Sequence, residues 1–139
     1  MALVIHTSTA TRNARLQALM NQLDADTNPG YIEFYTATQP ATGGDAITTQ
    51  TLLGTVTLSK PSGTITGGVL TFSTITADSS ADDAGDIDWC RFYDGAGTWV
   101  MDGNCGLSAS DALVRFQTVT TQVGGIIQIL SGSLTEGGA

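Results

Sequence analysis

The residues best equipped for chemistry lie in one stretch, DWCRFYDGAGTWVMDGNCG, which covers residues 88–106 and holds both tryptophans and both cysteines of the chain. A thiol nucleophile or a zinc site there would need histidine partners at suitable spacing. The only histidine is His6, far away in the sequence, and the chain has neither a C-x-x-C nor an H-x-x-x-H motif. We therefore expect no catalytic residue, no bound metal or cofactor, and no enzymatic activity.

A second candidate is the acidic run TADSSADDAGDID, with carboxylates at Asp78, Asp82, Asp83, Asp86 and Asp88. Carboxylate oxygens are the ligands that Ca²⁺ prefers, but the glycine and glutamate positions of an EF-hand loop are not matched. A carboxylate pair for glycoside hydrolysis is a weaker alternative, because no aromatic cleft signal accompanies it. We interpret the run as a solvated acidic loop, with calcium binding left open.

Composition excludes several classes of partner. The chain has 139 residues, which predicts one domain. Its net charge of −8, with only 5 lysines and arginines, argues against nucleic acid and against an anionic membrane surface. Charged residues make up 13%, so we expect a neutral polar surface that tolerates protein neighbours. No segment has the apolar length of a signal peptide or a membrane span, so we expect synthesis in the cytoplasm with both cysteines reduced.

The periodicity predicts one helix over residues 11–24, since Leu16, Leu19, Met20 and Leu23 repeat at helical spacing. Thr9 or Thr11 is the expected N-cap, and Asn28-Pro29-Gly30 should end the segment. The helix is too short to be stable alone, so its apolar stripe must dock either on the domain or on a neighbour. We expect a loose arm over residues 1–10, a single β-domain over residues 11–139 that includes the helix, and a loose tail over residues 133–139.

The rest of the chain is typical of short strands with turn residues between them. The predicted strands cover residues 31–38, 51–59, 68–76, 86–93, 98–102, 112–121 and 126–131. This spacing indicates an all-β fold, with a sandwich, a jelly roll and a barrel all compatible with it.

A hairpin within residues 86–102 decides which aromatic residues face outward. A four-residue loop over residues 94–97 pairs Tyr93 with Thr98, and a loop one residue shorter would shift the register. One face then carries Cys90, Phe92, Trp99 and Met101 as a core patch, and the other carries Trp89, Arg91, Tyr93, Val100 and Asp102. Cys105 falls opposite Asp86 in this register, so a disulfide with Cys90 is disfavoured and two free thiols are expected, with Cys90 buried.

Five residues are the predicted partner contacts. Trp89, Tyr93 and Val100 lie on the outward face of the hairpin, with burial of Trp89 under a loop as the alternative. Arg12 and Arg15 form a basic pair on an otherwise acidic chain, suited to an acidic partner surface.

The order of segments resembles a known family. It runs from ATRNARLQAL through YIEFYTATQPAT and LLGTVTLSKP to QVGGIIQIL, and its most specific part is TADSSAD…W-x-R-x-x-D-x-x-G at residues 76–97. This succession resembles the small all-β cement (decoration) proteins on the capsid exterior of tailed bacteriophages. The resemblance implies an antiparallel β-sandwich of jelly-roll type with one short N-terminal helix. It also implies a non-enzymatic virion protein that binds the major capsid protein at subunit junctions and forms a homodimer or homotrimer.

One alternative belongs to a different functional class. Jelly rolls also host lectins, so the chain is alternatively a tail-associated glycan- or receptor-binding β-sandwich module. Trp99 or Trp89 would then be the sugar platform, and the acidic run would hold Ca²⁺. An enzyme such as a glycosidase is the least favoured hypothesis, because the chain offers so few candidate catalytic groups.

Overall fold

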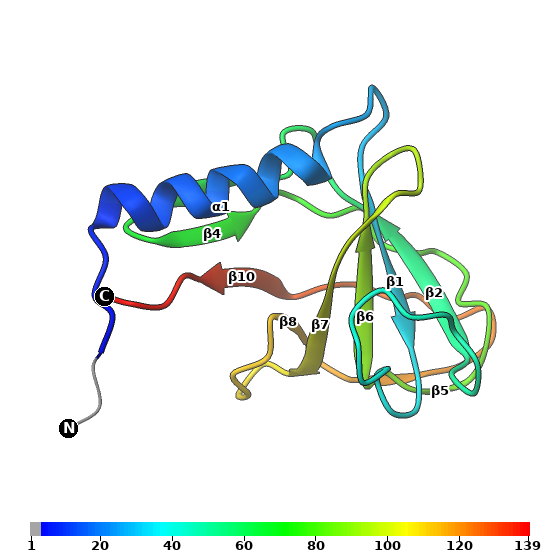
Figure 1. Cartoon of the computed structure of the whole chain (residues 1–139). Coiled ribbons are helices and arrows are strands. Elements are labelled where there is room, and N and C mark those ends of the chain that lie inside the picture. The colour runs from blue at the N-terminus through cyan, green and yellow to red at the C-terminus, as the bar shows by residue number, and fades with distance from the viewer. Residues whose placement is uncertain (1–3) are drawn as a thin grey trace.

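The computed structural model describes residues 4–139 and shows an all-β, jelly-roll-like sandwich with a single N-terminal helix (Figure 1). Its elements are α1 (Thr9–Leu23), β1 (Tyr31–Tyr35), β2 (Leu52–Thr57), β3 (Gly63–Thr66), β4 (Val69–Phe72), β5 (Gly85–Asp86), β6 (Trp89–Tyr93), β7 (Trp99–Leu107), β8 (Val114–Phe116), β9 (Thr120–Thr121) and β10 (Ser131–Thr135). The predicted fold class is confirmed.

Eight strands form one curled sheet in the order β2-β1-β6-β7-β8-β10-β4-β3, and β5 pairs with β9 separately. Strand β7 connects the two halves, because its first part pairs with β6 and its last residues, Cys105–Leu107, pair with β8. The β7–β8 pair is parallel, so the expectation of a purely antiparallel sandwich is wrong at this one junction. A glycine is needed at position 103, where β7 passes from one half of the sheet to the other, because a Cβ there would lie 2.5 Å from a Leu113 methyl carbon.

The core lies between the two halves of the curled sheet. Phe34 on β1 meets Phe116 on β8 edge to face, with ring centroids 5.2 Å apart. Phe72 on β4 stacks on Phe92 of β6 at 5.5 Å. Aromatic pairs at such distances add to the stabilisation that burial of the rings already supplies. The same cluster includes buried Leu16 and Leu23 of α1, so the helix belongs to this core.

Helix α1 begins two residues before the predicted start and is capped by Ser8, whose hydroxyl accepts from the Thr11 N–H at 3.1 Å. The prediction of a threonine cap is therefore wrong. The apolar stripe is confirmed: Leu16 and Leu23 are buried, and Leu19 and Met20 are half-buried against the core. The helix lies over the β3–β4 hairpin, where the Gly68 N–H donates to the Asn13 side chain at 2.8 Å.

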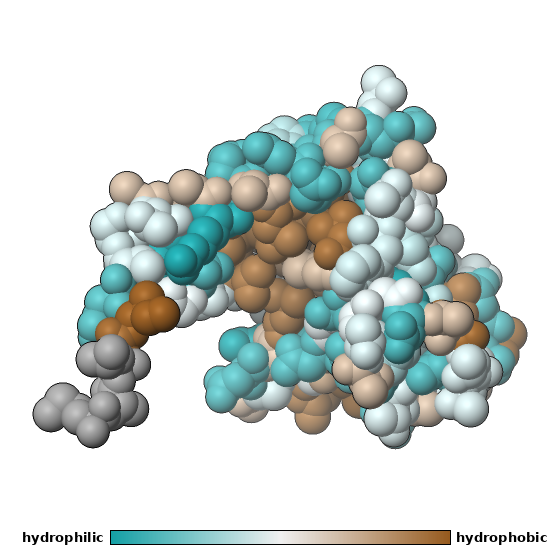
Figure 2. Space-filling view, in the orientation of Figure 1, coloured by the Kyte–Doolittle hydropathy of each residue, from teal (hydrophilic) through white to brown (hydrophobic). Residues whose placement is uncertain are grey.

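Hydrophobic atoms also gather in a hollow beneath α1, on the side that faces β7 (Figure 2). The half-buried hydrophobic residues of the flanking elements include Leu19 and Met20 on α1, Met101 on β7 and Leu134 on β10. The helix thus covers this end of the sandwich incompletely. Within residues 4–139, no helix combines the length and the apolar character that crossing a bilayer requires.

The two ends of the chain depart most from the predictions. The first three residues of the predicted loose tail belong to β10, which lies inside the sheet between β8 and β4. Of the predicted strand over residues 126–131, only Ser131 lies in a strand, and Ile127 makes an isolated bridge. Strand β3 was not predicted. The Thr7 N–H donates to the Gly138 carbonyl at 2.6 Å, so this part of the arm is held by the tail. Residues 1–3 of the predicted arm lie outside the described residues.

The interior position of β10 can be tested at Gly132. A Cβ at this residue would lie 2.9 Å from the Phe72 ring, so we expect Gly132→Val to lower the free energy of unfolding by about 1–3 kcal/mol through overpacking. Ser133 is the matched control, because it is exposed on the same strand and Ser133→Val should be nearly neutral. Urea denaturation measures both. Equal stability of the two variants would contradict the interior placement.

Candidate interaction surface

The β6–β7 hairpin contains a bulge that changes the predicted register. Phe92 pairs with Met101 but Tyr93 pairs with Trp99, so Val100 is the extra residue. The loop is also one residue shorter than predicted, since the Asp94 N–H donates to the Thr98 carbonyl at 3.0 Å. Trp99 therefore lies opposite Tyr93 on the outer face, where it is 43% exposed, and its predicted core position is wrong. Val100 is half-buried and packs against the core, which corrects its assignment to the outward face. Cys105 pairs with Val114 and not with Asp86.

Trp89 lies on the outer face as predicted, yet only 2% of it is exposed. Its ring stacks on Tyr35 with centroids 4.8 Å apart, and the Arg91 guanidinium lies over it at 5.3 Å. The segment after β1 covers this stack, because the Asp45 carbonyl accepts from Arg91 at 2.8 Å. Burial under a loop, the alternative stated for Trp89, is therefore the observed state, and Trp89 is not an exposed contact.

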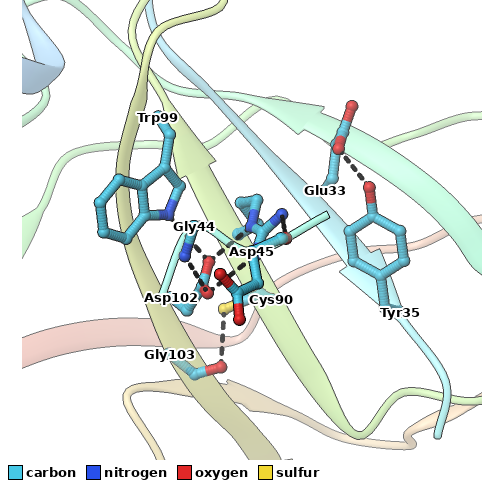
Figure 3. Close-up of polar contacts among 9 residues, drawn as sticks. Glu33, Tyr35, Gly44, Asp45, Cys90, Trp99, Asp102 and Gly103 are labelled. Atoms are coloured by element: carbon cyan, nitrogen blue, oxygen red, sulfur yellow. Dashed lines mark hydrogen bonds and ion pairs between the residues drawn. The ribbon is translucent and has the colours of Figure 1, made fainter. Parts of the chain in front are cut away.

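An ion pair between Arg91 and Asp102 organises this face (Figure 3). The two side chains meet in a bidentate arrangement, with N–O distances of 2.7 and 2.9 Å, and both are almost fully buried. Asp102 also accepts from the Trp99 indole N–H at 3.0 Å and from the Gly44 N–H at 3.2 Å. One carboxylate therefore holds a strand, a loop and the exposed tryptophan together.

The protonation of this pair follows from its contacts. Burial raises the pKa of Asp102, but hydrogen bonds from Arg91, Trp99 and the Gly44 amide outweigh it and leave the pKa below its ordinary value. The hydrogen bond to Asp102 raises the pKa of Arg91. Nearby, the Tyr35 hydroxyl donates to Glu33 at 2.5 Å, and burial and this bond raise the pKa of Tyr35 (Figure 3). The charges of Arg91 and Asp102 thus neutralise each other within this layer.

The two cysteines are free thiols, as predicted, with Cys90 buried and Cys105 half-buried. The Cys90 thiol donates to the Gly103 carbonyl at 3.5 Å (Figure 3). Burial, and then the interaction with Cys105, raise the pKa of Cys90 well above its ordinary value. A thiol with a raised pKa is a poor nucleophile, so Cys90 serves packing.

An aromatic row is the most prominent exposed feature of the outer face. It consists of Tyr31, Tyr93 and Trp99, which lie directly opposite one another on β1, β6 and β7. The rings of Tyr31 and Tyr93 stack at 5.0 Å, and both tyrosines are half-buried. Tyr93 therefore occupies the outward face that was predicted for it, and the exposed tryptophan of this face is Trp99, not Trp89.

The two predicted basic contacts are engaged within the chain. Arg12 donates to the Thr7 carbonyl and to the Thr9 hydroxyl, the latter at 3.1 Å. Arg15 pairs with Glu136 at 3.3 Å, in a half-exposed ion pair. Both arginines therefore fasten the ends of the chain in the isolated protein, and their predicted role as partner contacts stays a prediction.

Four of the five carboxylates of the acidic run, those of Asp78, Asp83, Asp86 and Asp88, accept hydrogen bonds from within the chain. Asp78 accepts from the Thr55 and Ser80 N–H groups at 2.9 Å each, and Asp88 accepts from the Ala37 N–H at 2.7 Å. In the part of the chain that the structure describes, no group of three His, Cys, Asp or Glu side chains could hold a metal ion.

A groove opens beyond the end of β8. It has a volume of about 500 Å³ and lies between residues 116–121 and residues 126–130, two segments that the sequence predicts as strands. Its apolar lining consists of Ile87, Phe116, Ile126, Ile127, Ile129 and Leu130, and threonines and glutamines complete it. None of its lining residues is charged.

Comparisons with protein-family models, with curated proteins and with solved structures find no match to this chain. The candidate surfaces therefore rest on geometry. Sequence reasoning missed the Arg91–Asp102 contact and the groove. The opposite charges on the two hairpin strands were a usable signal for the first, since a loop one residue shorter and a one-residue bulge together make them direct neighbours.

The exchange of roles between the two tryptophans gives a direct test. We expect Trp89→Ala to cost about 3–5 kcal/mol in unfolding free energy, because it removes a large buried ring. Trp99→Ala should cost much less, about 1 kcal/mol, since an exposed ring and one hydrogen bond are lost. Guanidinium denaturation followed by circular dichroism compares them. A larger loss for Trp99→Ala would contradict the observed register.

The ion pair predicts a dependence of stability on pH. Asp102→Asn should cost about 3–5 kcal/mol at pH 7, because Arg91 is left buried without its counter-charge. The folded-state pKa of Asp102 lies below its ordinary 3.8, so its contribution is complete above about pH 4 and is lost as the pH falls through the folded-state pKa. The gap between wild type and variant should therefore shrink below about pH 4.

The exposed ion pair between Arg15 and Glu136 supplies the control for this experiment. Glu136→Gln removes a charge that faces half-exposed Arg15, so we expect a loss of about 1 kcal/mol or less. Denaturation at pH 7 and at low pH measures both variants. A constant gap for Asp102→Asn over this range would exclude the assigned role of the carboxylate.

Proposed function

We propose that the protein is a non-enzymatic virion component that binds the exterior of a phage capsid and cements major capsid protein subunits. The observation that carries the proposal is the aromatic row, in which exposed Trp99 adjoins two half-buried tyrosines, on a domain with few charges. Tyrosine and tryptophan are enriched at protein interfaces, while charged residues are depleted from interface centres. The resemblance of the segment order to cement proteins supports the same function.

The surroundings of Trp99 suit it to a contact of this kind. Its indole N–H is bound to Asp102, and the Gly43–Gly44 backbone packs on its ring, where a Cβ of Gly44 would lie 3.0 Å from ring carbons. A ring held in this way loses little conformational entropy on binding. Multiple copies on a symmetric shell would then combine modest single contacts through avidity.

Trp99 also favours the second candidate, a tail-associated glycan- or receptor-binding module. A partly exposed ring fixed beside a carboxylate and backbone amides can stack on a sugar and orient its hydroxyl groups. Buried Trp89 cannot serve as this platform without displacement of the loop that covers it. Both functions would use Trp99, so the Trp99→Ala variant alone does not distinguish them. The binding partner, a capsid or a glycan, has to be varied as well.

The test is co-sedimentation with expanded capsids that lack the protein, prepared from the phage that encodes it. We expect Trp99→Ala to weaken capsid binding roughly thirtyfold, as for a central interface tryptophan. Leu107→Ala is the matched control, because Leu107 is a similarly exposed hydrophobic residue (49%, against 43% for Trp99) at the opposite end of β7. It should bind like wild type.

Two outcomes would contradict the proposed function. Wild-type protein that stays in the supernatant, or Trp99→Ala that binds as tightly as wild type, would exclude the aromatic row as a capsid contact. Binding of the wild type to a glycan array, abolished by Trp99→Ala and without capsid binding, would establish the second candidate.

A further inference from the structure

The groove beyond β8 lies between two strand-forming segments that do not pair with each other. Residues 117–121 and 126–130 are rich in β-branched residues, and Gly124-Gly125 between them would suit a hairpin turn. At the base of the groove, the Leu130 N–H donates at 2.9 Å to the carbonyl of Arg115, which lies in β8 just before the first segment. Beyond this bond they separate around the cavity of about 500 Å³.

Some backbone groups of the separated segments have no partner, although Thr120–Thr121 pair with β5 and Ile127 bridges to Asp78. In the described part of the chain, the backbone N–H groups of Thr118, Gln128 and Ile129 donate to no protein acceptor. Ile126, which lines the groove, is 72% exposed, and Leu130 is exposed as well. Open edges beside exposed aliphatic side chains are the features that strand addition uses: backbone hydrogen bonds give affinity, and pockets accept alternate side chains.

The N-terminal arm has the chemistry of a matching strand. Val4 and Ile5 are large, exposed and β-branched, and Ala2 and Leu3 continue the apolar run in the sequence. No acidic residue occurs before Asp24. The groove is bordered by the acidic run, since Asp78 bonds to Ile127 and Ala81 bonds to Gly125. An acidic segment would be repelled there, whereas this arm is neutral and the helix after it carries Arg12 and Arg15.

The arm and the groove lie at opposite ends of the molecule. The Thr7 N–H bond to Gly138 and the His6 contact with the Ala139 carbonyl hold the arm at the left-hand end of Figure 1. Residues 117–130, drawn in orange, run toward the right-hand end, and they supply most of the groove lining (Figure 1). The contact is therefore made between molecules, not within one.

We propose that the apolar run ending at Val4 and Ile5 of one copy inserts as an added strand into the groove between residues 117–119 and 127–130 of a second copy. The contact joins different surfaces of the two copies, so its repetition gives a ring where the rotation between copies closes and an open filament where it does not. This self-association goes beyond capsid binding and does not depend on it.

The test is the mass of the full chain by sedimentation velocity over a range of concentrations. Val4→Asp with Ile5→Asp alters the arm, and Ile126→Asp alters the groove. Each should weaken assembly at least roughly tenfold, because an unpaired charge would have to be buried in an apolar slot. Val123→Asp is the matched control: Val123 is 69% exposed on the same turn, does not line the groove, and should leave assembly unchanged. Circular dichroism verifies that all variants are folded.

Two further measurements identify the contact itself. The arm variant retains an intact groove and the groove variant retains an intact arm, so an equimolar mixture should form dimers that neither variant forms alone. Amide hydrogen exchange should show protection of Thr118, Gln128 and Ile129 in the wild-type oligomer, lost in the arm variant.

Several results would overturn the proposal. These are a wild type that is monomeric at all concentrations, undiminished assembly of the arm and groove variants, and dissociation by Val123→Asp. Protection that appears instead on α1 and β7 would place the arm in the hollow beneath the helix. None of these results depends on capsids, so failure here and failure of the proposed function are distinguishable.

Discussion

The buried ion pair between Arg91 and Asp102 is the contact on which the outer half of the structure depends. With Tyr93 opposite Trp99 and no bulge, Arg91 would face Met101, and Asp102 would face Cys90 on the core side. The bulge between Phe92 and Tyr93 makes the two charges direct cross-strand neighbours, at 2.7 Å. A buried charge without its partner costs several kcal/mol, so the pair favours the bulged register over the regular one.

The ion pair also creates a third layer over the outer face of the sheet. Arg91 lies on the Trp89 ring and reaches the Asp45 carbonyl, while Asp102 receives the Gly44 N–H. The loop after β1 is thereby fastened over a stack that would otherwise be exposed. Strand β6 is consequently buried on both faces, from Trp89 through Phe92, although it belongs to an otherwise two-layered sandwich.

The sequence predicts what local periodicity controls. The helix and the strands β1, β2, β4 and β6 were found because their apolar residues repeat with the correct spacing. The exposure of the two tryptophans was not predicted, because for Trp99 it depends on the length of the hairpin loop, and for Trp89 on a loop distant in sequence. Strand β10 was missed for a related reason: its sequence, SGSLT, has little strand propensity, and its position between β8 and β4 supplies the pairing.

The opposite error occurred over residues 117–121 and 126–130, which have strand propensity but make few strand contacts. Beyond β8, residues 120–121 leave the main sheet to pair with β5, and Ile127 bridges to Asp78. Strand propensity alone does not show which segment these residues pair with, because each partner comes from a segment dozens of residues away. The candidate groove was therefore not predicted from the sequence, although the six apolar residues that line it are easily recognised there.

The place of β10 in the sheet has a consequence for biosynthesis. Strand β4 leaves the ribosome well before β10, the strand that pairs with it on the side away from β3. During translation, the nascent chain therefore carries an open edge on β4 and another on β8, beside aromatic side chains that later form the core. The sheet cannot be completed vectorially, from the N-terminus onward. Its final step is the entry of a late strand between two waiting edges, and a chaperone that shields those edges would act during this interval.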